Sequence, residues 1–104
     1  MPELIKVATV KDIAPGEHKI VMVGDTKIGI VRDAAGNWFA IEDVCTHDGG
    51  PLAEGEIEDG CICCPRHGAK FDLKTGKALT LPAFGKVGAW PVVIEGDDVK
   101  IQFS

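Results

Sequence analysis

The sequence predicts a single all-β domain made of short antiparallel strands. Its 104 residues suit one domain, and its 13 glycines and 6 prolines favour turns over helices. Runs that alternate apolar with polar residues recur at short spacing, which is typical of an antiparallel meander. The stretch from Cys45 to Gly68 breaks this rhythm, because it is dense in glycine, proline, cysteine, histidine and acidic residues. We therefore expect a β scaffold whose middle segment builds a site.

The first predicted strand lies at residues 5–7, where apolar and polar residues alternate. The sequence Thr9-Val10-Lys11-Asp12 that follows resembles a capping box and allows one helical turn. In the strand predicted at 26–32, Ile28 and Ile30 alternate with the neighbouring positions and share one face. Turn signals separate the remaining strands, which are predicted at 18–23, 38–41, 55–58, 61–63, 70–72, 90–95 and 99–103.

The charge balance argues against nucleic acid as a partner. Sixteen acidic residues outnumber 11 basic ones, for a net charge of −5, whereas a nucleic-acid binder needs a basic surface. The segment Met1–Lys6 lacks the basic and apolar regions of a signal peptide. No apolar run approaches the roughly 20 residues that a membrane span needs. We therefore expect a cytoplasmic protein without a membrane partner.

The four cysteines favour metal or redox chemistry, because the cytoplasm keeps thiols reduced. Cys45-Thr46-His47 and Cys64-Pro65-Arg66-His67 each pair one thiolate with one imidazole, and 16 residues lie between the two motifs. Two thiolates and two imidazoles suit zinc or an iron–sulfur centre. A structural zinc site groups like ligands together. The mixed pairs seen here instead match a [2Fe–2S] centre in which thiolates hold one iron and imidazoles hold the other.

The double motif resembles the signature of the Rieske iron–sulfur family, and the resemblance extends over nearly the whole chain. Phe39-Ala40-Ile41 resembles the family's approach strand. Pro51-Leu52, followed by Gly55, resembles its first cluster loop, and residues 64–76 resemble its second loop and exit strand. Pro15-Gly16-Glu17 is similar to the start of small Rieske ferredoxins.

The resemblance implies the Rieske fold, an antiparallel β-sandwich or barrel scaffold with an inserted small cluster-binding subdomain. Residues 1–104 would form a single Rieske domain, with the subdomain at about 43–72. Its cofactor would be one [2Fe–2S] cluster. The cofactor-binding residues would be two cysteines on the inner iron and two histidines on the outer iron, namely Cys45, Cys64, His47 and His67. Leu81-Pro82-Ala83 would cover the cluster.

Four positions imply a low reduction potential. High-potential members of the family carry a disulfide between the two loops, where this sequence has Gly50 and Arg66. They also carry a serine and a tyrosine that donate hydrogen bonds to sulfur, where this sequence has Ala69 and Phe71. We therefore expect a potential roughly in the lowest third of the Rieske range, which runs from about −150 to +300 mV.

Other residues near the motifs have more ordinary interpretations. Cys61 and Cys63 share one face of a predicted strand and are interpreted as packing residues rather than a redox pair. His18 is expected at the surface, and Trp38 and Trp90 in the core. Acidic residues flank the motifs and form either a solvated face or a docking surface for a basic partner; they are Glu42, Asp43, Asp48, Glu54, Glu56, Glu58 and Asp59.

The resemblance implies a soluble ferredoxin that carries one electron between proteins and has no catalytic residues of its own. The donor would be a flavin reductase, and the acceptor a terminal oxygenase or a similar oxidoreductase. An oxygenase large subunit also needs a mononuclear-iron domain, for which 104 residues leave no room. One alternative is a Rieske-like small subunit of a larger oxidoreductase such as assimilatory nitrite reductase. Another is a Cys2His2 zinc-binding module.

Overall fold

The computed structural model describes residues 3–43, 52, 55–58, 60–63, 70–79 and 87–103. Within these ranges the chain is almost entirely β, and its one helical element is a single 3₁₀ turn, as the sequence predicts. In chain order the elements are β1 (Glu3–Thr9), η1 (Val10–Asp12), β2 (His18–Val23), β3 (Thr26–Arg32), β4 (Trp38–Glu42), β5 (Ile57–Glu58), β6 (Cys61–Cys63), β7 (Lys70–Asp72), β8 (Ala89–Trp90), β9 (Val92–Glu95) and β10 (Asp98–Phe103).

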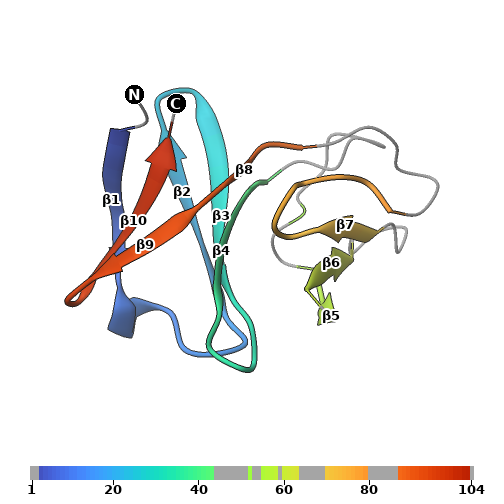
Figure 1. The fold of residues 1–104 in the computed structure, drawn as a ribbon, viewed down its shortest axis with the longest axis horizontal. Helices are drawn as coiled ribbons and strands as arrows, with labels where there is room; N and C mark the ends of the chain where they lie inside the picture. Colours follow the sequence, from blue (N-terminus) through green and yellow to red (C-terminus); the bar gives the residue numbers. More distant parts are fainter. Residues whose placement is uncertain are drawn as a thin grey trace.

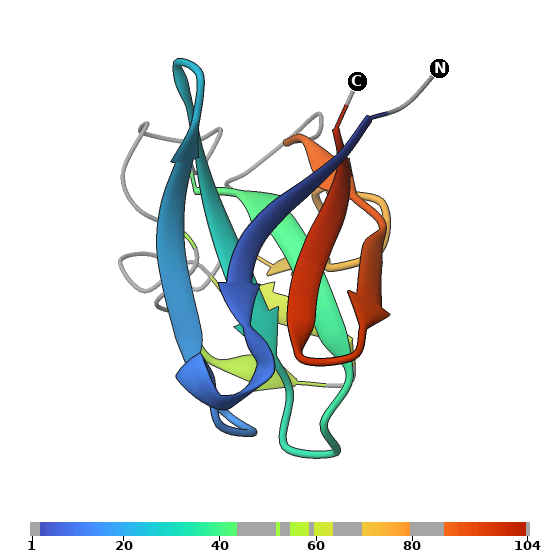
Figure 2. The same ribbon diagram turned by 90° about the vertical axis from the view of Figure 1, so that its left-hand side faces the viewer.

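Two antiparallel sheets form what we call the scaffold (Figure 1). One sheet has the order β1-β10-β9, and the other has the order β2-β3-β4-β8. Figure 2 shows the two sheets from the scaffold side, with the chain termini at one end of β1 and β10. The apolar core between them is buried; it consists of Ala8, Ile13, Ile28, Ile30, Ala40, Val99 and Ile101.

The pairing of β1 differs from the expected meander. Strands β2, β3 and β4 do follow one another across their sheet, but β1 pairs with β10 at the opposite end of the chain. The 3₁₀ turn η1 and the loop after it carry the chain from one sheet to the other. The first and the last strand of the chain therefore lie side by side in the same sheet.

The strand expected at residues 90–95 is divided at Pro91. β8 pairs with β4 in one sheet, whereas β9 pairs with β10 in the other. Proline has no backbone N–H to donate to a ladder, and its carbonyl accepts from the N–H of Gln102 at 3.0 Å. Pro91 therefore lies where the chain passes between the sheets.

A third sheet, which we call the small sheet, lies beside the scaffold in Figure 1 and has the order β5-β6-β7. Ile62 of β6 pairs with Phe71 of β7, and both side chains are fully buried. The core of the small sheet is distinct from that of the scaffold; its buried residues are Val31, Ile41, Leu52, Ile62, Phe71, Leu73 and Val87.

Strands β3 and β4 are shared between the two cores. Ile28 and Ile30 face the scaffold core, as the alternation predicts. Val31 and Ile41 are also fully buried, and they pack against the small sheet. β3 and β4 therefore carry buried apolar side chains on both faces. Movement of the small sheet away from them would expose Val31 and Ile41.

Candidate functional site

The four candidate ligands, Cys45, His47, Cys64 and His67, lie outside the described residues, as does Leu81-Pro82-Ala83. The residues that border these segments are described, and their contacts define where each segment begins and ends. We use the names first segment for residues 44–51, second segment for 64–69 and third segment for 80–86.

The first segment is closed at its base by a side chain. Asp43 follows directly on β4, and its Oδ1 accepts a hydrogen bond from the backbone N–H of Leu52 at 2.8 Å. Leu52 is fully buried, and 5% of Asp43 is exposed. Asp43 and Leu52, which precede and follow the first segment in sequence, are therefore held together.

The second segment joins two adjacent strands. Cys63 at the end of β6 pairs with Lys70 at the start of β7. Cys64 and His67 therefore belong to the connection of an antiparallel hairpin. Because antiparallel pairing brings the ends of two strands together, the second segment begins and ends at neighbouring residues of the small sheet.

The bases of the first and second segments are next to each other. The N–H of Gly55 donates to Leu52 O at 3.0 Å, and the N–H of Cys63 donates to Glu56 O at 2.8 Å. A Cβ atom at Gly55 would overlap the carbonyl oxygen of Cys63. Glycine is therefore required at 55 for the backbone after the first motif to lie directly against the backbone before the second.

The third segment is fixed to both of the others. At its start, Leu79 N donates to Lys70 O at 2.7 Å, beside the second segment. At its end, Glu42 Oε1 accepts from Gly88 N at 3.0 Å, and Glu42 N donates to Gly88 O at 2.8 Å. The bases of the three segments thus form a closed ring at one end of the scaffold.

The donor set fits an iron–sulfur centre. Each of the first two segments contains one cysteine and one histidine in its sequence, and the bases of these segments lie side by side. The close backbone approach at Gly55 resembles the tight wrapping that an inorganic cluster requires. Within the described ranges no other group of histidine, cysteine and acidic side chains is arranged to hold a metal ion.

The acidic residues near the motifs have different roles. Glu42 and Asp43 accept hydrogen bonds from the N–H groups of Gly88 and Leu52, and Asp43 is buried and so does not belong to a solvated face. Glu56 is exposed, as a docking surface or a solvated face would require. The signal that could have identified Glu42 and Asp43 is their position at the end of a buried strand, directly before a motif.

The other residues singled out from the sequence are largely as expected. Cys61 and Cys63 are half-buried thiols on the face of β6 opposite the buried Ile62, and neither is in a disulfide. His18 is exposed on β2. Trp38 and Trp90 are partly buried and pack against the scaffold core.

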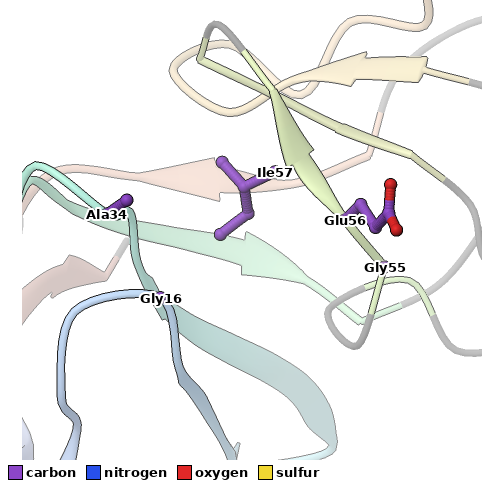
Figure 3. A pocket seen from close by; sticks show the side chains of 5 residues that line it. All are labelled: Gly16, Ala34, Gly55, Glu56 and Ile57. Carbon is purple, nitrogen blue, oxygen red and sulfur yellow. The ribbon is translucent and has the colours of Figure 1, made fainter.

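A crevice of about 380 Å³ lies between the small sheet and the loops of the scaffold (Figure 3). Gly16 and Ala34 line it from the scaffold, and Gly55, Glu56 and Ile57 line it from the other side. Ile57 extends toward the turn that carries Ala34, whereas Glu56 points away from it. A lining with a single ionisable side chain offers few polar groups to orient a substrate.

Sequence comparison identifies the family of the chain. The family model of the Rieske [2Fe-2S] domain matches residues 3–91. The ferredoxin component of biphenyl 2,3-dioxygenase from Rhodococcus jostii (strain RHA1) is 40% identical over 101 residues, which cover 97% of this chain and 94% of that protein. Among the described residues there is no helix long and apolar enough to cross a membrane.

Solved structures with the same fold include ferredoxins. The ferredoxin of carbazole 1,9a-dioxygenase from Nocardioides aromaticivorans IC177 superposes with a TM-score of 0.87 and 29% identity, over 97% of this chain and 98% of that one. A chain in the complex of reduced oxygenase and oxidised ferredoxin of carbazole 1,9a-dioxygenase has a TM-score of 0.82 and 29% identity, over 95% and 92% of the two chains. A protein described as an NADH-dependent nitrite reductase small subunit from Mycobacterium tuberculosis shares the fold, with a TM-score of 0.85 and 17% identity over 97% and 95%. The chain therefore belongs to the Rieske [2Fe-2S] domain family, as a ferredoxin that carries electrons on a [2Fe-2S] cluster.

Proposed function

We propose that this ferredoxin passes single electrons from a flavin reductase to an oxygenase that acts on an aromatic substrate. The observation that carries the proposal is the ring formed by the bases of the three segments, because the two segments that contain the Cys/His motifs begin and end beside each other. The relative from Rhodococcus jostii is named as a dioxygenase ferredoxin component, and a matching chain comes from a complex with an oxygenase. Both support an oxygenase as the acceptor.

We assign the four ligands from the motif spacing. Cys45 and Cys64 would hold one iron, and His47 and His67 would hold the other. When bound, such a cluster takes up one electron at a potential above that of all-cysteine clusters, because two neutral imidazoles replace two charged thiolates. The histidines would lie on the outer side, where a partner can approach.

The chain itself orients the ligands and is proposed to have no catalytic residues. Contacts of Asp43, Leu52 and Gly55 join the base of the first segment to that of the second, and Glu42 joins the end of the third segment to the base of the first. The 1–104 chain is proposed to be one Rieske domain, with its cluster-binding subdomain at about 43–72. The half-buried thiols of Cys61 and Cys63 suit a reducing compartment, and we propose the cytoplasm.

The potential is proposed to be low for this family, roughly in the lowest third of the range of about −150 to +300 mV. Phe71 supports this proposal, because its ring is fully buried and has no hydroxyl to donate to sulfur. Hydrogen bonds to the sulfurs are one of the factors that set the potential of an iron–sulfur cluster.

Electron paramagnetic resonance of the reduced protein tests the proposed ligand set. We expect the signal of a histidine-ligated [2Fe–2S] centre, with two irons and two acid-labile sulfides per chain on this assignment. His47→Ala should abolish that signal, whereas His18→Ala should preserve it, because His18 is exposed on β2. Retention of the signal in His47→Ala would refute the ligand assignment.

Two other functions predict different results. A Cys2His2 zinc module would be colourless, with one zinc and no sulfide. A nitrite reductase small subunit would co-purify with a large subunit, but the similarity at 17% identity is one of fold. Reduction of the protein by a purified flavin reductase, followed by turnover of an aromatic-ring oxygenase, tests the leading proposal directly.

A further inference from the structure

Asp43 is a carboxylate in buried surroundings. It follows the last residue of β4, and its side chain is only 2% exposed. A carboxylate almost never lies this deep unless hydrogen bonds or an opposite charge compensate it. The compensation found here comes from both kinds of contact.

Each oxygen of the carboxylate has a different contact. Oδ1 accepts from the backbone N–H of Leu52 at 2.8 Å. Oδ2 lies 3.3 Å from Nζ of Lys27, whose side chain is 53% exposed. The first contact is buried and reaches across the first segment, whereas the second is half open to water. Because water screens the ion pair, we expect the bond to Leu52 to matter more.

The backbone of Asp43 is held as firmly as its side chain. Its N–H donates to Lys27 O at 2.8 Å. The preceding residue, Glu42, makes two hydrogen bonds with Gly88: its backbone N–H donates to Gly88 O, and its side-chain Oε1 accepts from Gly88 N–H. The backbone of Asp43 is therefore held in the scaffold by hydrogen bonds, and Leu52 is held in turn by its own hydrogen bond to Asp43 Oδ1.

We propose that Asp43 is a positioning residue for the cluster, which fixes the first segment and with it the two candidate ligands Cys45 and His47. The role rests on the ligand assignment made above. It requires an acceptor at the place of Oδ1 rather than a negative charge. Residues that orient metal ligands from outside the coordination sphere change metal affinity by about 10- to 100-fold when they are replaced.

Three substitutions separate the acceptor from the charge. Asp43→Ala removes both. Asp43→Asn keeps an acceptor oxygen of the same reach and removes the charge. Asp43→Glu keeps the charge and displaces the acceptor by one methylene. The matched control is Asp33→Ala, because Asp33 also closes a loop by accepting the backbone N–H of Asn37, at 2.8 Å, but in a hairpin of the scaffold.

The experiment measures two properties of the reduced holoprotein: the g-values of its paramagnetic resonance signal, and the rate at which a chelator removes its iron. We expect Asp43→Ala to lose iron about 10-fold faster than wild type and to show shifted g-values. Asp43→Glu should change both in the same direction. Asp43→Asn and Asp33→Ala should match wild type.

The comparison between Asn and Glu remains decisive if the alanine variant does not fold. A larger effect for Asn than for Glu would overturn the proposal, because the charge would then be what matters. Wild-type behaviour in all three Asp43 variants would overturn it as well. Failure of the proposed function has a separate signature, since the wild-type protein would then lack a histidine-ligated iron–sulfur signal.

Discussion

The scaffold and the small sheet both have buried apolar cores, but they differ in the length of the strands that form them. The strands of the scaffold run for up to seven residues, as in β1 and β3, and pair along their length. The strands of the small sheet have two or three residues each. An isolated sheet of this size would be marginal, yet Ile62, Phe71 and Leu73 in and beside it are as buried as any residue of the scaffold.

The small sheet reaches this burial because residues of the scaffold complete its core. Val31 and Ile41 come from scaffold strands and complete its core. Side-chain bonds from Glu42 and Asp43 then attach its loops to the end of β4. The scaffold is therefore specified by its own ladders, whereas the small sheet depends on tertiary contacts and, we expect, on the cluster.

Removal of the cluster should have the largest effect and should separate the two regions. Without iron, we expect amide protection in β6 and β7 to fall toward that of a locally unfolded segment, while β3, β4 and β10 stay protected. Hydrogen exchange monitored by mass spectrometry on the holoprotein and the chelated protein measures this difference. Equal protection in both regions after iron removal would show that the small sheet is self-sufficient.

Core substitutions should sharpen the same contrast. Phe71→Ala should cost about 3–5 kcal/mol, because it empties a fully buried position of the small-sheet core. Ile101→Ala in the scaffold core should cost about 2–5 kcal/mol. Phe71→Ala should also release iron, whereas Ile101→Ala should keep the resonance signal unchanged in the folded fraction. Urea unfolding with iron analysis measures both, and iron loss in the Ile101 variant alone would reverse the expectation.

Two glycines with similar backbones but different surroundings give a smaller contrast. Gly24 in the scaffold and Gly76 beside the small sheet have φ values of 60° and 77°. A Cβ at Gly24 meets nothing, whereas one at Gly76 would overlap the carbonyl oxygen of Val87, at the end of the third segment. Gly24→Ala should cost about 1–2 kcal/mol from backbone strain, and Gly76→Ala should cost more. Equal melting temperatures of the two variants would argue against a tight junction at Val87.

The smallest effect concerns a carboxylate of the scaffold. The N–H of Thr9 donates to Asp12 Oδ2 at 3.0 Å; this backbone bond, helped by the Thr9 side chain and Lys19, lowers the pKa of Asp12 below its usual 3.8. Because the folded-state pKa is the lower one, ionised Asp12 stabilises the protein above pH 3.8, and that contribution disappears as the pH falls through the lowered pKa. The stability gap between wild type and Asp12→Asn should close at low pH, and the Asp12 carboxyl resonance should titrate below 3.8. A midpoint above 3.8 would contradict this.

Local pattern predicted most of the scaffold. Strands β2 and β3 begin and end at the predicted residues, because period-two alternation and flanking turn residues depend on near neighbours in sequence. The partner of β1 could not be predicted in this way, because its pairing with β10 joins opposite ends of the chain. The burial of Val31 could not be predicted either, because alternation puts it on the strand face opposite Ile28 and Ile30, and only the small sheet covers that face.

Residue types and their spacing were enough to identify the family, the cofactor class and the two Cys/His motifs, because they carry that chemistry. The sequence also determined the order of the strands along the chain. The hydrogen bonds that Glu42 and Asp43 accept from Gly88 and Leu52 could not be predicted before the fold was known. The physical reason is that a carboxylate's role depends on which N–H groups and which solvent surround it, and those neighbours are brought together only by folding.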